Sequence, residues 1–172
     1  MRYLIGAVLL LFLFNACSSK EGGSSLLQRY EKKRSSYKIL QKTEKIQLYD
    51  NNVTKALLTA TYLYEQGLKS DRIKDEKFIV GVYLEEEDSN RLGDAYRLKL
   101  DGKEPLKIEP LTKESKYLEN VSFVIQWNTY YLVTFPYVPQ KSFMLTFESD
   151  RYGKGEQRFS KIAKYLLDDP AL

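Results

Sequence analysis

The chain has 172 residues, with 27 lysines and arginines against 23 aspartates and glutamates, one cysteine and no histidine. A net charge of +4 is too small, and too evenly spread, to predict nucleic-acid binding, which needs a strongly basic face. The absence of histidine from the sequence excludes Ser-His-Asp and Cys-His catalysis and any imidazole metal site.

The N-terminus has the layout of an export signal. Arg2 gives a positive start, residues 4–14 form an apolar run of eleven, and Asn15 and Ala16 are short residues before Cys17. This run is too short to cross a bilayer as a helix, which needs about 20 apolar residues. We therefore expect residues 1–16 to be a signal peptide that is removed.

The four residues Phe-Asn-Ala-Cys at positions 14–17 resemble the lipobox of bacterial lipoproteins. Ala16 and Cys17 match that motif, whereas Phe14 and Asn15 stand where leucine and a small residue are usual. The resemblance implies that the chain is cleaved before Cys17, and that Cys17 is acylated with chains such as palmitate and becomes the first mature residue. Ser18, in place of an aspartate, implies sorting to the outer membrane, with the body facing the periplasm or the cell surface.

The sequence contains no second cysteine with which Cys17 could form a disulfide, so lipidation explains the residue better than a structural thiol does. Each buried methylene of an acyl chain adds about 0.8 kcal/mol of membrane affinity, and two or more chains hold firmly. The expected product is a stable membrane anchor at Cys17.

Residues 17–42 are predicted to form a lipidated tether and a basic stalk. Residues 18–25 are polar and rich in Gly and Ser, which is typical of a flexible linker. Residues 26–40 place apolar side chains on one helical stripe, but they also fit extended chain leading into a first strand. The basic tract at residues 29–38 is either a solvated stalk or a contact with anionic lipid head groups.

From residue 43 onward the apolar residues recur mostly with a period of two, which predicts strands. Such alternation is seen at residues 46–48, 78–84 and 143–147. It also appears at residues 96–100 and again at 106–108, on either side of Asp101-Gly102, a pair suited to a tight turn. We therefore expect a β-hairpin over residues 95–109.

The longest β pattern covers residues 121–135, with apolar side chains at nearly all odd positions. Fifteen residues exceed the usual strand length, so we expect a bend or turn near Asn128-Thr129. The shared odd positions assign Trp127 and Tyr131 to the core. Tyr130 is off that face, and Tyr137 lies in a proline-flanked loop, so these two tyrosines are predicted to be exposed.

Two segments fit either a strand or a helix. Residues 53–66 have helical spacing but also read as a strand rich in Thr and Tyr, and we favour the strand because its neighbours are strands. Residues 157–167 have the same ambiguity, after a turn expected at 152–155. Seven or so strands predict an all-β, antiparallel β-sandwich of immunoglobulin-like or C2-like type over residues 43–172.

No catalytic, cofactor or metal site is assigned from the sequence, so we do not expect an enzyme. A carboxylate-based hydrolase is the exception left open, because carboxylates remain available. Residues 85–94 are acidic and partly resemble a calcium loop, but Leu92 and Lys99 stand where oxygen ligands are needed. We therefore favour a charged strand end and loop that discourage edge pairing, and a looser calcium site over residues 85–94 stays open as the alternative.

Tyrosine is frequent in this sequence, with 14 residues, and tyrosine is favoured both in strands and at interfaces. Tyr130 and Tyr137 are therefore the candidate binding residues. The expected function is a structural or protein-interaction module of a larger envelope assembly, held at the outer membrane through Cys17. The alternative is a glycan- or peptidoglycan-binding module that uses exposed tyrosines.

Overall fold

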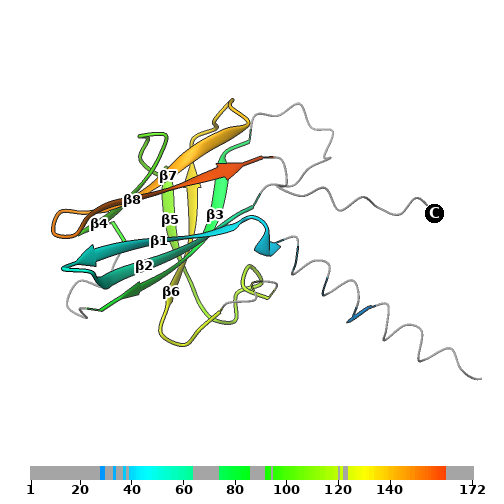
Figure 1. Cartoon of the computed structure of the whole chain (residues 1–172). Helices are drawn as coiled ribbons and strands as arrows, with labels where there is room; N and C mark the ends of the chain where they lie inside the picture. Colours follow the sequence, from blue (N-terminus) through cyan, green and yellow to red (C-terminus); the bar gives the residue numbers. More distant parts are fainter. Residues whose placement is uncertain are drawn as a thin grey trace, which may run out of the picture. The chain divides into compact units, whose positions relative to one another are not determined.

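A computed structural model describes residues 28–29, 33, 37, 39–63, 74–85, 92–93, 95–119, 121 and 124–161 (Figure 1). The chain divides into two compact units, residues 1–35 and residues 36–172, and every strand lies in the second. The predicted signal peptide and Cys17 lie outside the described residues. Among the described residues, no helix is long and apolar enough to cross a bilayer.

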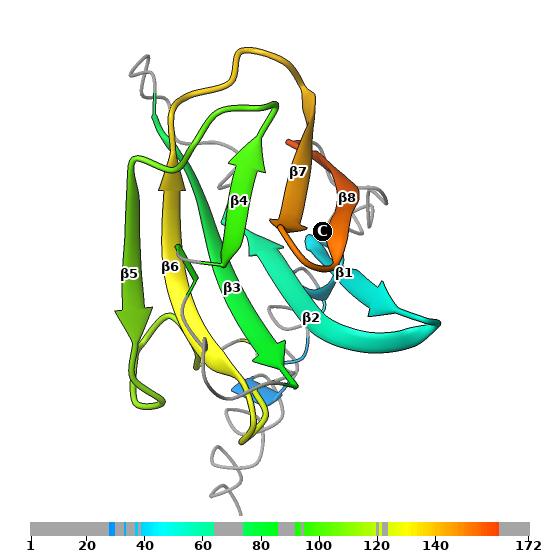
Figure 2. The ribbon, with the colours of Figure 1, turned by 90° about the vertical axis from the view of Figure 1, so that its left-hand side faces the viewer.

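In the part of the chain that the structure describes, eight antiparallel strands form two sheets (Figures 1 and 2). The five-stranded sheet has the order β1 (Thr43–Asp50), β2 (Val53–Tyr62), β3 (Glu76–Leu84), β6 (Thr129–Phe135), β5 (Lys107–Leu111). The three-stranded sheet has the order β4 (Tyr96–Leu100), β7 (Ser142–Ser149), β8 (Gly153–Ser160). The predicted all-β, antiparallel, two-sheet fold is confirmed.

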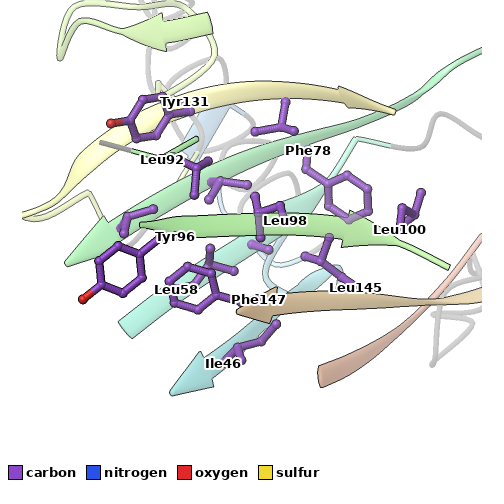
Figure 3. Close-up of a cluster of buried hydrophobic side chains, with 14 of the residues drawn as sticks. Ile46, Leu58, Phe78, Leu92, Tyr96, Leu98, Leu100, Tyr131, Leu145 and Phe147 are labelled. Atoms are coloured by element: carbon purple, nitrogen blue, oxygen red, sulfur yellow. The ribbon is translucent and has the colours of Figure 1, made fainter. Parts of the chain in front are cut away.

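The main core lies between the two sheets, because each strand turns alternate side chains inward. Phe78 of β3 is fully buried there, and its ring centroid lies 5.1 Å from that of Tyr62 and 5.2 Å from that of Phe159. Figure 3 shows part of this core, to which both sheets contribute Ile46, Leu58, Phe78, Leu98, Tyr131, Leu145 and Phe147. The expected core position of Tyr131 is therefore confirmed.

The two sheets approach each other closely where β1 meets β8, and both ribbon views place these strands side by side (Figures 1 and 2). A Cβ atom added to Gly155 of β8 would lie only 2.4 Å from Cγ2 of Ile46 and 3.2 Å from the carbonyl oxygen of Gln47. A larger residue would force the strands apart, so glycine permits this contact.

The strand order can be compared with that of an immunoglobulin constant domain, which has sheets of order ABED and CFG. Without β3, the present strands would follow the same pattern, β1-β2-β6-β5 and β4-β7-β8. Here β3 is inserted between β2 and β6, so that β2 and β6 run in the same direction.

The predicted hairpin over residues 95–109 is wrong, because β4 and β5 belong to different sheets. Asp101 and Gly102 do form a tight turn, with φ of 46° and 79°, and Leu100 and Lys103 form an isolated bridge across it. Beyond that bridge the chain crosses to the other sheet. The alternation identified two strands and a turn but not which strands pair.

The ambiguous segments are strands where they are described. Residues 53–62 form β2, as favoured from the sequence, and residues 64–66 lie outside the described part. Residues 157–160 belong to β8, which begins at Gly153 because the turn falls at residues 150–152, earlier than expected. Residues 162–167 are not described. In the stalk, the N–H of Gln41 donates to the carbonyl of Tyr37 at 3.1 Å, a helical contact.

Candidate interaction surface

A second apolar cluster lies on the outer face of the five-stranded sheet, away from the main core. Ile79 of β3 and Tyr130 of β6 alternate with core-facing neighbours and pack instead against Leu118 and Val121. Leu118 and Val121 belong to the connection between β5 and β6. The connection therefore folds across this face of the sheet.

Tyr130 is the centre of this cluster, with only 2% of its surface exposed. Its ring lies over Gly81, where an added Cβ atom would be 2.8 Å from Cε1 of Tyr130. Its hydroxyl oxygen accepts a hydrogen bond from the backbone N–H of Ile125 at 2.8 Å. The predicted exposure of Tyr130 is therefore wrong, because the connection covers the outer face on which the ring lies.

The backbone held by Tyr130 presents three apolar side chains to solvent. Trp127 is 76% exposed, Ile125 45% and Val124 37%. The predicted burial of Trp127 is wrong, because the chain turns at residues 126–127 and β6 begins only at Thr129. This turn confirms the expected break, and odd positions before it do not share the face of odd positions after it. We call residues 124–128 the Trp127 loop.

The sheet continues this apolar surface. Val82 of β3 pairs with Thr129 of β6, the residue that follows the Trp127 loop, and the next residue of β3, Tyr83, is 39% exposed. No charged residue occurs in the sequence from Asn120 to Gln140. We call Tyr83, Val124, Ile125 and Trp127 the interaction surface.

The outer face of the three-stranded sheet differs, since its charges pair with one another. Arg97 of β4 contacts Asp150 at 2.5 Å and Glu148 at 3.2 Å, and Lys99 contacts Glu148 at 2.6 Å. The hydrogen bond from Lys99 lowers the pKa of Glu148 most, and the hydrogen bond from Arg97 lowers it further. The hydrogen bond from Arg97 also lowers the pKa of Asp150. This face therefore carries paired charges rather than an apolar contact surface. We call Arg97, Lys99, Glu148 and Asp150 the charge ladder.

A buried ion pair lies at the opposite end of β6 from the Trp127 loop. Glu76 is 4% exposed, and its Oε1 accepts hydrogen bonds from Nζ of Lys161 at 2.6 Å and from the N–H of Val138 at 3.0 Å. Its Oε2 accepts a hydrogen bond from the Tyr62 hydroxyl at 2.5 Å. The ammonium of Lys161 also donates to the carbonyl of Val138. This network ties the end of β8 to β2, β3 and the loop after β6.

Tyr137 is 36% exposed, which confirms the predicted exposure. The ammonium of Lys161 lies 4.4 Å from its ring centroid, in cation-π contact with the ring. Tyr137 lies two residues after the end of β6, whereas Tyr130 is the second residue of that strand, so the structure does not bring the two candidate tyrosines together.

The remaining sequence candidates lie largely outside the described residues. Residues 86–91 and 94 of the acidic segment are not described, and neither is Cys17. Within the described ranges, no three acidic or thiol side chains are grouped closely enough to hold a metal ion.

Sequence reasoning missed the two best-defined features. Glu76 and Lys161 are 85 residues apart, and no sequence spacing predicts their pairing. The exposure of Trp127 had a weak signal, since Gln126 and Asn128 on either side are polar and asparagine favours turns.

Comparison with known proteins gave no assignment: no protein-family model, no curated protein and no solved structure matches this chain.

Proposed function

We propose that this protein is an envelope lipoprotein, anchored in the outer membrane through Cys17, whose β-sandwich is a structural or protein-interaction module of a larger assembly. The lipobox-like sequence at residues 14–17 and the export signal before it support the anchor. The body faces the periplasm or the cell surface, according to which side of the outer membrane receives the lipid.

The observation that carries the proposal is the exposure of Trp127 on a loop fixed by a buried side chain. Tryptophan and tyrosine are enriched among the residues that contribute most to protein binding, because each has a large apolar body and a polar tip. Trp127, Ile125 and Tyr83 would leave water on docking, and the Trp127 loop brings no charge that would need desolvation.

The contrast between the two outer faces supports the choice of docking side. Arg97, Lys99, Glu148 and Asp150 on the three-stranded sheet already have partners within the molecule. Burying such pairs in an interface would lose hydration with little electrostatic gain. The five-stranded sheet, which carries the interaction surface, is therefore the docking side.

The glycan-binding alternative remains a second proposal, with a changed set of residues. Sugar rings stack on exposed aromatic faces, but Tyr130 is buried and Lys161 lies against the ring of Tyr137. Trp127 is the aromatic ring whose exposure would suit this role best. Peptidoglycan binding that depends on Trp127 would favour this alternative.

The test is crosslinking in intact cells with a tagged, Cys17-anchored full chain, followed by recovery of the crosslinked assembly. Trp127→Ala is expected to lower recovery by about tenfold or more, as for a residue of the hot-spot class. Leu106→Ala is the matched control, because Leu106 is 61% exposed but lies outside the interaction surface. Cys17→Ala should also lower recovery, by releasing the body from the membrane.

Equal recovery with Trp127→Ala and Leu106→Ala would contradict the proposed docking surface. The protein can also be sedimented with purified peptidoglycan. If it co-sediments and the Trp127→Ala variant does not, the glycan-binding alternative would be favoured.

A further inference from the structure

We infer that Tyr130 is a positioning residue that holds the Trp127 loop in one preformed shape, and that this loop docks as a rigid knob into a shaped, uncharged recess of a protein partner. The inference rests on the proposed function and deepens it by naming the class of partner and the residue that sets the affinity.

Two sets of contacts hold the ring of Tyr130, and one hydrogen bond joins its hydroxyl to the Trp127 loop. The ring is held against Gly81, where only a glycine leaves room for it. The ring also packs with Ile79, Leu118 and Val121, so its position does not depend on the hydroxyl alone. The hydroxyl then accepts the hydrogen bond from the N–H of Ile125, which fixes the backbone two residues before Trp127.

This rigidity favours a protein partner over a bilayer. Ordering a loop on binding reduces affinity, and a loop that is already ordered avoids that loss when its partner has a fixed shape. A fluid bilayer presents no fixed shape, so it would not reward a preformed backbone. Tyr83 extends the apolar surface from the Trp127 loop onto β3, which is a broader contact than the tip alone.

The charge around the loop gives the same indication. The connection that covers the sheet carries Lys113 and Lys116, but also Glu114 and Glu119, and all four are exposed. Their charges cancel, so the connection gains no net attraction to anionic head groups, whereas membrane-binding surfaces usually carry a basic excess. The chemistry that fits is an apolar protein recess with a polar acceptor for the indole N–H.

The positioning role can be measured on the free protein, since Trp127 is the only tryptophan in the chain. We expect Tyr130→Phe, which keeps the ring, to lower the fluorescence anisotropy of Trp127 in the full chain held in detergent micelles. Tyr131→Phe is the matched control, because Tyr131 is the next residue of β6 and lies in the core between the sheets (Figure 3). It should leave the anisotropy unchanged.

The partner class can be measured by placing a photo-crosslinking benzoylphenylalanine at position 127 of the full chain in intact cells. We expect a discrete protein adduct whose yield falls about five- to tenfold when Tyr130→Phe is added, the effect of one lost hydrogen bond. Addition of Tyr131→Phe should not change the yield. Crosslinking from position 106, which replaces the exposed Leu106, should not give the same adduct.

An unchanged anisotropy in Tyr130→Phe would overturn the positioning role, whether or not a partner is found. Lipid adducts without a protein adduct at position 127, or a protein adduct that is indifferent to Tyr130→Phe, would overturn the rigid-knob docking. The anisotropy needs no partner, so a failure of the proposed function is distinguishable from a failure of this inference.

Discussion

Tyr130 and Tyr131 are adjacent in β6 and show how much a single step along a strand changes the role of a side chain. Tyr131 faces the core between the sheets, and Tyr130 faces the outer cluster and bonds the backbone of Ile125. Both are buried, because the outer face of this sheet is covered as well. A tyrosine off the core face is therefore not an exposed tyrosine here.

At the same scale, Lys161 neutralises a carboxylate that is almost completely buried. Lys161→Met would leave Glu76 charged without its cation, and removing one partner of a buried pair typically destabilises by about 3–5 kcal/mol. Urea denaturation should show a loss of this size. The double variant Glu76→Gln/Lys161→Met should regain most of it, since no buried charge then remains.

A loss below about 1 kcal/mol for Lys161→Met would contradict the buried network of Glu76, Lys161 and Tyr62.

The charge ladder of Arg97, Glu148 and Asp150 predicts a pH dependence. Folding lowers the pKa of Glu148 and Asp150 below the ordinary values of 4.5 and 3.8. Their stabilising contribution is therefore fully present above those values and is lost as the pH falls through the lowered, folded-state values. The free energy of unfolding can be measured by urea denaturation at roughly pH 6 and roughly pH 3. Its decrease between these two pH values should be smaller in Arg97→Gln than in the wild type.

High salt should reduce this difference between the two proteins, because Asp150 is exposed, Arg97 and Glu148 are only partly buried, and their interactions are therefore screened. If Arg97→Gln lost as much unfolding free energy at acid pH as the wild type does, groups other than Glu148 and Asp150 would govern the pH dependence of stability.

At the scale of elements, period-two alternation predicted the strands well, because each strand buries one face in the core. It failed where the backbone changes direction without a change in residue type. Residues 121–135 have apolar residues at nearly all odd positions, yet the turn at residues 126–127 places Trp127 in solvent. Asp101-Gly102 likewise predicted a turn correctly but not that the next strand joins the other sheet.

The contact between β1 and β8 gives a test of how the two sheets approach. Gly155→Ala would place a methyl group 2.4 Å from Cγ2 of Ile46, and such overpacking typically destabilises by about 1–3 kcal/mol. Arg158→Ala, on the exposed side of the same strand, should change stability by about 0.5 kcal/mol or less. Thermal or urea unfolding of both variants measures the difference, and equal stabilities would argue against a close β1 to β8 contact.

At the scale of the whole molecule, the all-β class could be predicted from the sequence because it depends on local patterns. The strand order could not, since β3 lies between β2 and β6 through pairings that no local signal specifies. The interaction surface depends on the same long-range packing. Gly81 and Tyr130 are far apart in sequence, and their contact across β3 and β6 helps to place the hydroxyl that binds the Trp127 loop.

The membrane anchor is a prediction about the whole chain. Intact-mass analysis of protein extracted from membranes should show a chain that begins at Cys17 and carries several acyl groups, because one chain alone gives only marginal binding. In the Cys17→Ala variant, the acylated form of the protein should be absent from the membrane extract. A free thiol at Cys17, or a retained leader, would contradict the lipoprotein assignment.

The proposed docking depends above all on Trp127, the only tryptophan in the sequence, being held in water on a fixed loop. Its most direct test is acrylamide quenching of Trp127 fluorescence in the native protein. We predict a water-like emission spectrum and strong quenching that change little when urea unfolds the chain. A blue-shifted native emission that is protected from acrylamide until unfolding would place Trp127 in the core and contradict its exposure on the loop.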